Sequence, residues 1–289
     1  MPETTFTHYL ARRHQNSTLK AHQQNLGYWM AWLDGQGRPE AKNAPYADLL
    51  AYVRHERARG IDVSTLNLRL ASLRKYYDFL IEAGQLLVNP AGGLHLRGKV
   101  RRVIREPLAP AELEALYQGY SRRAKGDQAR LVDVRNAVIL GLMVYQSLHS
   151  GELGRLEMGH IHLDDGKVYV PGGARSNPRE LTLAITQVLL LDRYLHQVRP
   201  QLGPPGDKLF SGNVRNHLAA LIPQLRQLHP GVRSALHIRA SVILGWLKVH
   251  NKRQVQYMAG HRHIESTERY SHQEMDALTD QLAKHHPFG

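Results

Sequence analysis

Apolar positions in the first hundred residues recur at spacings of three and four, which is the pattern of amphipathic helices. One such stripe begins after a candidate N-cap at Ser17 and ends before Gly35. Its members are Leu19, His22, Leu26, Trp29 and Leu33. A second stripe begins after Ser64, ends at Gly84, and consists of Leu66, Leu70, Leu73, Tyr77 and Leu80. Such helices bury their stripes against one another, so the pattern predicts a helical bundle over residues 1–96.

The helical pattern breaks after this bundle. Asn89-Pro90 and Gly92-Gly93 interrupt any helix, and the segment that follows is strongly basic. We interpret residues 97–107 as a linker, either a solvated connector or a strap against a DNA backbone, and the basic character of the chain favours the strap. Together with cations expected on the outer face of the preceding helix, the residues predicted to contact DNA are Arg69, Arg74, Lys75, Arg97, Lys99, Arg101, Arg102 and Arg105.

A second domain is predicted over residues 108–289. Pro110 suits the first turn of a helix, and a strongly apolar helix follows it. The apolar period then changes to two around Tyr169 and Thr182, which predicts a short antiparallel sheet. Helical segments are expected at 132–145, 188–198, 214–228, 238–250, 255–258 and 273–284. The predicted fold class is therefore mainly α with a small antiparallel β-sheet, in two domains.

The net charge of the chain narrows the class of partner that it can be expected to bind. The chain has 38 Lys and Arg against 25 Asp and Glu, a net charge of +13. A field of this sign favours a nucleic-acid partner, and the aromatic content of 7% favours duplex over single strands. The absence of cysteine excludes disulfides, Cys-ligated zinc and a thiol nucleophile. With no signal-peptide pattern and no apolar run of membrane-spanning length, we expect a cytoplasmic protein without a membrane partner.

The most specific motif is MAGHRHIESTERYSH, which ends at His272. It places Gly260-His261 nine residues before Tyr270, with Thr267 between them. This box resembles the third catalytic box of the tyrosine recombinase (phage integrase) family. VYQSLHSGELGRL resembles the first box, LHIRASVILGWLK resembles the second, and KVYVPGGARSNPRELTL resembles the family's β-hairpin. The resemblance covers nearly the whole chain, and its first hundred residues resemble the family's core-binding domain.

This resemblance implies a DNA-cutting and rejoining activity. In the family, a Tyr hydroxyl attacks a backbone phosphate and forms a 3′-phosphotyrosyl bond, with no ATP, metal or other cofactor. Two Arg and His residues stabilise the anionic transition state, and a Lys on the hairpin acts as the acid toward the leaving hydroxyl. Matched residue by residue, Tyr270 is the nucleophile, Arg239 clamps the phosphate, and His261 donates to a phosphate oxygen.

Other family positions do not match. The first-box Arg falls on His149, where a cationic imidazole would be the substitute. The second-box His falls on Leu236, although His237 stands one place later. The hairpin Lys falls near Gly173, and the nearest bases are Arg175 and Arg179. We expect Arg175 to be the substitute for the Lys, and neither the paired histidines nor any other group is expected to bind a metal.

Three functions remain open at this point. The first is a site-specific recombinase that acts as a tetramer on paired duplex sites, with its two domains closing around DNA as a clamp. The second is a catalytically impaired member that binds or bridges DNA, or modulates a partner recombinase. The third is a nicking-closing enzyme of the topoisomerase kind. All three place the protein on nucleoid DNA with no small-molecule substrate. A narrow apolar face after the motif would suit a protomer contact, and consists of Met275, Leu278 and Leu282.

Overall fold

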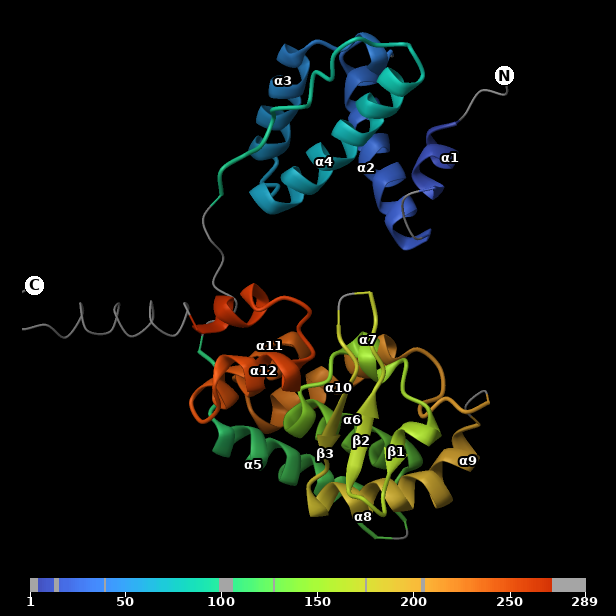
Figure 1. Ribbon diagram of the computed structural model, residues 1–289, viewed down its shortest axis with the longest axis vertical. Helices are drawn as coiled ribbons and strands as arrows, with labels where there is room; N and C mark the ends of the chain where they lie inside the picture. The colour runs from blue at the N-terminus through green and yellow to red at the C-terminus, as the bar shows by residue number, and fades with distance from the viewer. Residues whose placement is uncertain are drawn as a thin grey trace, which may run out of the picture. The chain divides into compact units, whose positions relative to one another are not determined.

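The computed structural model describes residues 5–12, 16–38, 40–98, 106–126, 128–174, 176–203 and 206–271, apart from the side chains of 16 and 17. The chain forms two compact units, Met1–Arg101 and Arg102–Gly289 (Figure 1). The expected basic linker overlaps the end of the first unit and the start of the second, and most of it lies outside the described residues. Each unit is therefore described by itself.

The first unit is a bundle of helices. Its elements are α1 (Phe6–Ala11), α2 (Asn16–Gly35), the 3-10 turn η1 (Ala41–Asn43), α3 (Tyr46–Ala58) and α4 (Val63–Glu82). The stripes on α2 and α4 meet in one core that contains Trp29, Leu33, Leu70 and Tyr77. The helix starts differ slightly from the expectation, because α2 already includes Asn16 and the cap of α4 is Asp62, which accepts from the Ser64 amide at 2.8 Å.

The second unit is mainly helical as well. In chain order it contains α5 (Pro110–Ser121), η2 (Arg122–Ala124), α6 (Leu131–Gln146), α7 (Ser150–Leu153), η3 (Met158–His160), α8 (Ile185–Arg193), the π-turn η4 (Tyr194–Val198), α9 (Arg199–Leu202), α10 (Val214–Leu228), α11 (Ala235–Leu247) and α12 (Lys252–Ala259). Helix α6 is buried along most of its length and forms the centre of the core, which agrees with its uninterrupted apolar sequence.

A three-stranded antiparallel sheet lies against these helices, in the order β1 (Ile161–His162), β2 (Lys167–Val170) and β3 (Arg179–Thr182) (Figure 1). Val168 and Val170 are buried, whereas Lys167 and Tyr169 are exposed, as the period of two requires. Val170 pairs with Arg179, so this arginine shares the buried face of the sheet. The predicted fold class, mainly α with a small antiparallel sheet, is confirmed.

One surface expectation is wrong. Arg69 does not lie on the outer face of α4, because it is buried and donates to Glu56 at 2.8 Å and to the Tyr52 hydroxyl at 3.3 Å. A carboxylate thirteen positions earlier draws the guanidinium inward, and the Tyr28 ring covers it with the guanidinium carbon 4.2 Å from the ring centroid. The expected helix 273–284 lies outside the described residues. None of the helices that the structure describes is both long and apolar enough to cross a bilayer.

Candidate phosphate-binding site

The turn between α6 and α7 positions the first part of the site. Helix α6 ends at Ser147, which adopts a left-handed conformation with φ of 55°. His149 then caps α7, since its Nδ1 accepts hydrogen bonds from the amides of Gly151 at 3.0 Å and Glu152 at 3.3 Å. In return, the Glu152 carboxylate accepts from the His149 amide at 3.1 Å. The turn therefore fixes the Glu152 side chain toward the interior, where it is fully buried.

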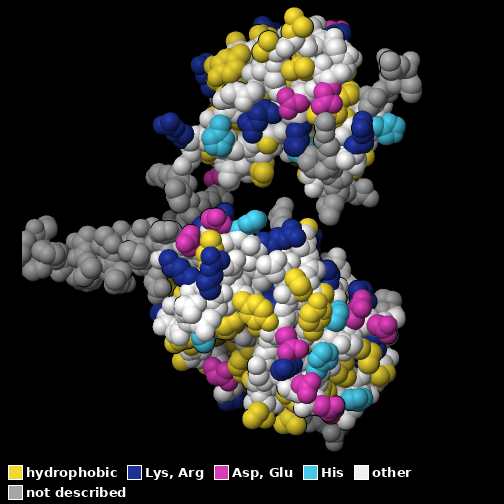
Figure 2. All heavy atoms as spheres, viewed as in Figure 1, with side chains coloured by type: hydrophobic (Ala, Val, Ile, Leu, Met, Phe, Trp, Pro, Cys, Tyr) yellow, Lys and Arg dark blue, Asp and Glu magenta, His cyan; other side chains and the backbone are white. Residues whose placement is uncertain are grey.

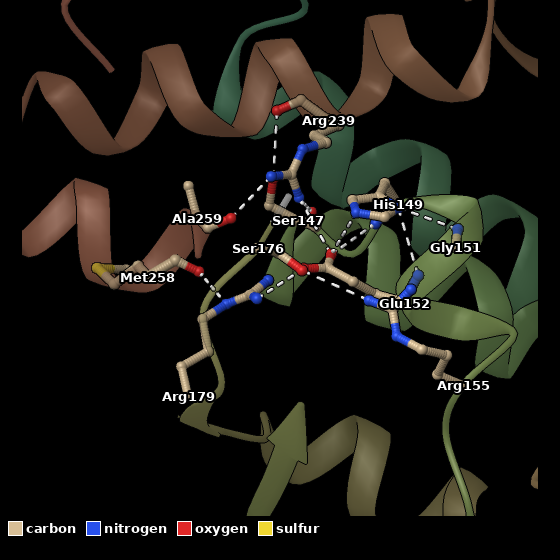
Figure 3. Close-up of polar contacts among 10 residues, drawn as sticks. All are labelled: Ser147, His149, Gly151, Glu152, Arg155, Ser176, Arg179, Arg239, Met258 and Ala259. Atoms are coloured by element: carbon tan, nitrogen blue, oxygen red, sulfur yellow. Dashed lines mark hydrogen bonds and ion pairs between the residues drawn. The ribbon is translucent and has the colours of Figure 1, made fainter. Parts of the chain in front are cut away.

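Glu152 stands between two arginines from distant parts of the chain. Arg179 from β3 donates to its Oε1 at 2.7 Å, and Arg239 from α11 lies 3.4 Å from its Oε2 (Figure 3). Burial alone would raise the pKa of Glu152, but the hydrogen bond and charge of Arg179 and the charge of Arg239 lower it. The carboxylate thus stays ionised, and it joins β3, α7 and α11 at one point.

Both arginines also hold backbone carbonyls. Arg239 donates through Nη2 to the Ala259 carbonyl at 2.7 Å and through Nη1 to the Ser147 carbonyl. Arg179 donates through Nε to the Met258 carbonyl at 2.7 Å, while its Nη2 is buried without a hydrogen-bond partner among the described residues. These bonds place the end of α12, and so the start of the third-box segment, directly over the arginine pair (Figure 3).

His261 and Tyr270 lie beside this pair. The His261 Nδ1 is 2.8 Å from the Thr267 hydroxyl, and the His261 ring stacks on the Tyr270 ring with centroids 5.9 Å apart. Burial lowers the pKa of His261 to about 4, with Arg239 and Arg179 acting in the same direction, so the imidazole is neutral near pH 7. When Thr267 donates to Nδ1, Nε2 carries the proton and is free to donate to a phosphate oxygen.

Tyr270 is nearly buried. Its exposed fraction is 9%, and it packs with Ile243, Leu244 and Val255. Burial raises the pKa of its hydroxyl, and the charges of Arg239 and Arg269 partly offset this effect. The phenol is therefore protonated in the protein alone, and it must lose its proton during any attack on phosphorus.

The structure brings four of the expected site residues together, namely His149, Arg239, His261 and Tyr270. It does not bring His237 to them, because that ring is buried with Nε2 3.1 Å from the Glu106 carbonyl. Leu236 is exposed at the start of α11. Arg175 and His272 lie outside the described residues. Burial lowers the pKa of His149, which favours its uncharged form and gives no support to a cationic substitute in the protein alone.

Three residues of the site were given no role from the sequence: Glu152, Arg179, and Arg155, whose Nη2 lies 3.4 Å from the Ser176 hydroxyl (Figure 3). The alternation of β3 was a usable signal for Arg179, since it shares the face of Leu181 and opposes the buried Val170. A charge in that register needs a buried partner, and Glu152 three residues after His149 was the available acid. Arg155 stands in a turn, where apolar periodicity carries no information.

The cations expected to contact DNA lie in different environments. Arg97 is exposed, Arg74 donates to the Leu94 carbonyl at 2.8 Å, and Lys75 is half-buried and has a partner. The other linker cations, Lys99, Arg101, Arg102 and Arg105, lie outside the described residues. Figure 2 shows a group of basic side chains over the α12 end of the second unit. The exposed bases of this segment include Lys252, Arg253, Arg262 and Arg269.

The arrangement is suited to an oxyanion. Two arginines share one carboxylate, so the centre keeps a positive charge beside a neutral His donor and a Tyr hydroxyl. Preorganised donors of this kind stabilise charge that develops on phosphate oxygens. No group of three or more His, Cys, Asp or Glu side chains that could hold a metal ion occurs among the residues described here.

Comparisons with known proteins find sequence similarity along the chain. A family described as "Phage integrase, N-terminal SAM-like domain" matches residues 4–84. Tyrosine recombinase XerC of Salmonella typhi is 26% identical over 300 residues, which cover 98% of this chain and 94% of the relative. XerC of Shigella flexneri is 25% identical, with 98% and 95% covered.

Solved structures share the fold. XerH site-specific recombinase bound to its difH substrate matches with a TM-score of 0.71 at 16% identity, over 93% of this chain and 81% of that one. The Tn1549 transposon integrase with circular intermediate DNA gives 0.69 at 14% identity, over 92% and 93%. A lambda integrase dimer bound to a core site gives 0.67 at 16% identity, over 92% and 74%.

Proposed function

Because this chain belongs to the tyrosine recombinase family, we propose that it binds duplex DNA and cuts and rejoins it through a 3′-phosphotyrosyl bond at Tyr270. The observation that carries the proposal is the convergence of Arg239, His261 and Tyr270 on the Glu152–Arg179 pair. The same three residues are those that the family motifs assign to phosphate binding and attack. Glu152, Arg179 and Arg239 come from three separate segments of the chain, so their meeting beside His261 and Tyr270 is not a result of local sequence.

The charge of the site fits the reaction. The pentacoordinate intermediate of phosphoryl transfer carries more negative charge on its equatorial oxygens than the diester does. Arg239 supplies a fixed cation. His261 is neutral near pH 7, so it donates a hydrogen bond to the phosphate without first taking up a proton. Glu152 holds the two arginines in place, and it keeps their like charges from separating the elements that carry them.

A covalent trapping experiment tests this function. Nicked suicide duplexes, drawn from DNA that the protein is first shown to bind, are incubated with wild type, Tyr270→Phe and Tyr257→Phe. Tyr257 is an exposed tyrosine of α12 and serves as the matched control. We expect a denaturant-resistant adduct with wild type and Tyr257→Phe but not with Tyr270→Phe. Strand exchange between two sites then separates a recombinase from a nicking-closing enzyme.

The second candidate is a member that binds DNA without cutting it. Three departures favour it: the neutral capping role of His149, the exposed Leu236, and the lack of a Lys near Gly173, where the hairpin Lys is expected. Loss of one transition-state donor typically lowers a rate by about 10²–10³. Intact DNA binding with no adduct from wild type would support this reading and would contradict cleavage at Tyr270.

The domain roles follow from the same proposal. Residues 1–96 form the core-binding domain, 97–107 a basic strap and 108–289 the catalytic-type domain, and both domains bind duplex DNA. A homotetramer on paired sites, or a complex with a partner recombinase, completes the active form. This places the protein in the cytoplasm on nucleoid DNA. Affinity that does not fall as salt rises would contradict phosphate-based binding.

A further inference from the structure

The space above Gly173 is occupied. A Cβ atom at this position would lie 2.8 Å from Nη2 and 2.9 Å from Cζ of Arg155. Arg155 belongs to the turn after α7, three residues beyond Glu152. Its guanidinium therefore fills the volume in which a side chain at position 173 would begin, and the resemblance puts the family's hairpin Lys near this position.

The donors of Arg155 are mostly unused. Its Nη2 makes one long hydrogen bond, to the Ser176 hydroxyl at 3.4 Å, and its Nε is buried without a partner (Figure 3). No carboxylate among the described residues pairs with it, in contrast to Arg179 and Arg239, which share Glu152. A buried donor that lacks an acceptor is costly to maintain, so this guanidinium favours an incoming anion.

The position of Arg155 connects it to the site. Ser176 forms a β-bridge with His261, and the Asn177 amide donates to the Gly260 carbonyl at 2.9 Å. The hairpin turn that contacts Arg155 is thus docked on the third-box segment. Arg155 also lies close to His149, because a Cβ atom at Gly151 would be 3.0 Å from Cε1 of His149 and 3.5 Å from Nη1 of Arg155.

We infer that Arg155 supplies, from the turn after α7, the cation that family members carry on the hairpin, and that it binds a non-bridging oxygen of the scissile phosphate. The inference rests on the proposed function and names a further phosphate-binding residue for it. Gly173 and Arg155 form a coupled pair in this interpretation, because a large side chain at 173 and the guanidinium compete for one space.

The chemistry differs from that of a lysine. An Arg stays protonated, so it stabilises the charge on phosphorus-bound oxygen and does not act as the acid. The Tyr270 oxygen forms a bond to phosphorus, and the bond from phosphorus to the 5′-oxygen breaks. The phenolic proton leaves to water, and the released 5′-oxygen takes a proton from water.

The test compares single-turnover adduct formation across matched variants. Arg155→Ala is expected to lower the rate by about 10²–10³. The double variant Arg155→Ala, Gly173→Lys is expected to form the adduct at least about tenfold faster than Arg155→Ala alone, because the vacated space then admits the Lys side chain. Arg155→Lys should retain part of the rate, and it keeps the test valid if the Ala variant folds poorly.

Arg122→Ala is the control for charge removal. Arg122 is exposed in η2, where the Ala124 carbonyl accepts a hydrogen bond from Arg193 of α8, and α8 lies at the opposite end of the unit from α7 (Figure 1). We expect this variant to match wild type. The slope of log affinity against log salt for duplex binding is measured in parallel, and Arg155→Ala should reduce its magnitude by about 0.9 for one lost phosphate contact.

The outcomes separate the two proposals. Absence of an adduct from wild type overturns the proposed cleavage, and the salt slope alone then decides whether Arg155 binds phosphate. A wild-type slope together with a wild-type cleavage rate in Arg155→Ala overturns the inference. A lost rate with no recovery in the double variant and no change of slope assigns Arg155 a structural role only, and it overturns the inference as well.

Discussion

Each unit has a buried glutamate that pairs with two arginines, and the two clusters differ in how many of those arginines are buried. In the first unit, Glu56 accepts from Arg69 at 2.8 Å and from Arg59 at 3.0 Å, but the Arg59 side chain is 62% exposed. In the second unit, the Arg179 and Arg239 side chains that share Glu152 are 0% and 7% exposed. The first cluster therefore buries one cation against one anion, whereas the second buries two cations against one anion.

This difference separates a structural ion pair from a binding site. Water solvates the second arginine of the Glu56 cluster, so no further anion is needed there. The Glu152 cluster retains a buried positive charge and an unpartnered Nη2 on Arg179. A buried charge without a counterion raises the free energy of the folded protein, and a bound phosphate would offset that increase.

The largest expected effect comes from removing each carboxylate charge. Glu152→Gln should lower the free energy of unfolding of the second unit by about 3–5 kcal/mol, because two buried arginines lose their anion. Glu56→Gln should have a smaller effect on the first unit. Hydrogen exchange in denaturant, followed in peptides of each unit of the full chain, measures both. An equal or larger loss for Glu56→Gln would break the comparison.

Removing an arginine from each cluster should separate activity from stability. Arg239→Met is expected to reduce single-turnover adduct formation by about 10²–10³, or roughly 2.7–4 kcal/mol of transition-state stabilisation. Arg69→Met should destabilise the first unit and leave the rate of the bound complex unchanged, since Arg69 is enclosed by Glu56, Tyr52 and Tyr28. Equal rate losses at saturating protein would show that the two clusters are not distinct in function.

Inorganic phosphate should stabilise only the second unit. At about 100 times its dissociation constant, a ligand that binds the folded state alone adds about 2.7 kcal/mol. We expect slower hydrogen exchange in peptides around Glu152 and Arg239, no change in peptides around Glu56, and no effect of phosphate on Arg239→Met. Protection spread evenly over both units would indicate nonspecific salt effects and contradict a built anion site.

The smallest expected effect is the change in stability over one pH unit. The pKa of His261 is about 4 in the folded protein, below its ordinary value near 6.5. The unfolded chain therefore takes up a proton first as pH falls, and the second unit should lose stability from pH 6.5 toward 4, by less than about 1.4 kcal/mol per pH unit. Thermal melts of wild type and His261→Gln test this, and a slope that survives in the variant would assign it to other groups.

Periodicity predicted the fold well because burial in helices and strands repeats along the chain. The α2 and α4 stripes and the alternation of β2 each reflect one face against a core, and the positions of Trp29, Leu70 and Val168 follow directly. Charged residues follow no such rule. The apolar pattern predicts an outer-face position for Arg69. It cannot show that the buried Glu56 carboxylate accepts a hydrogen bond from this arginine.

The site was predictable where each part of it belongs to a motif that is local in sequence. Gly260, His261 and Tyr270 lie in one motif with fixed spacing, and the structure places the His and Tyr rings in contact. The partners of Glu152 come from segments that no spacing rule connects. Arg155 is the extreme case, because its relation to Gly173 depends on the space that a missing side chain leaves.

The span between Glu152 and Arg239 also has a consequence during synthesis. The two residues are 87 positions apart, and ribosomes add about 5–20 residues per second. The carboxylate is therefore made roughly 4–17 s before its second arginine exists. A nascent chain that has emerged only through β3 carries Glu152 with Arg179 alone, so the cluster is complete only after α11 has emerged.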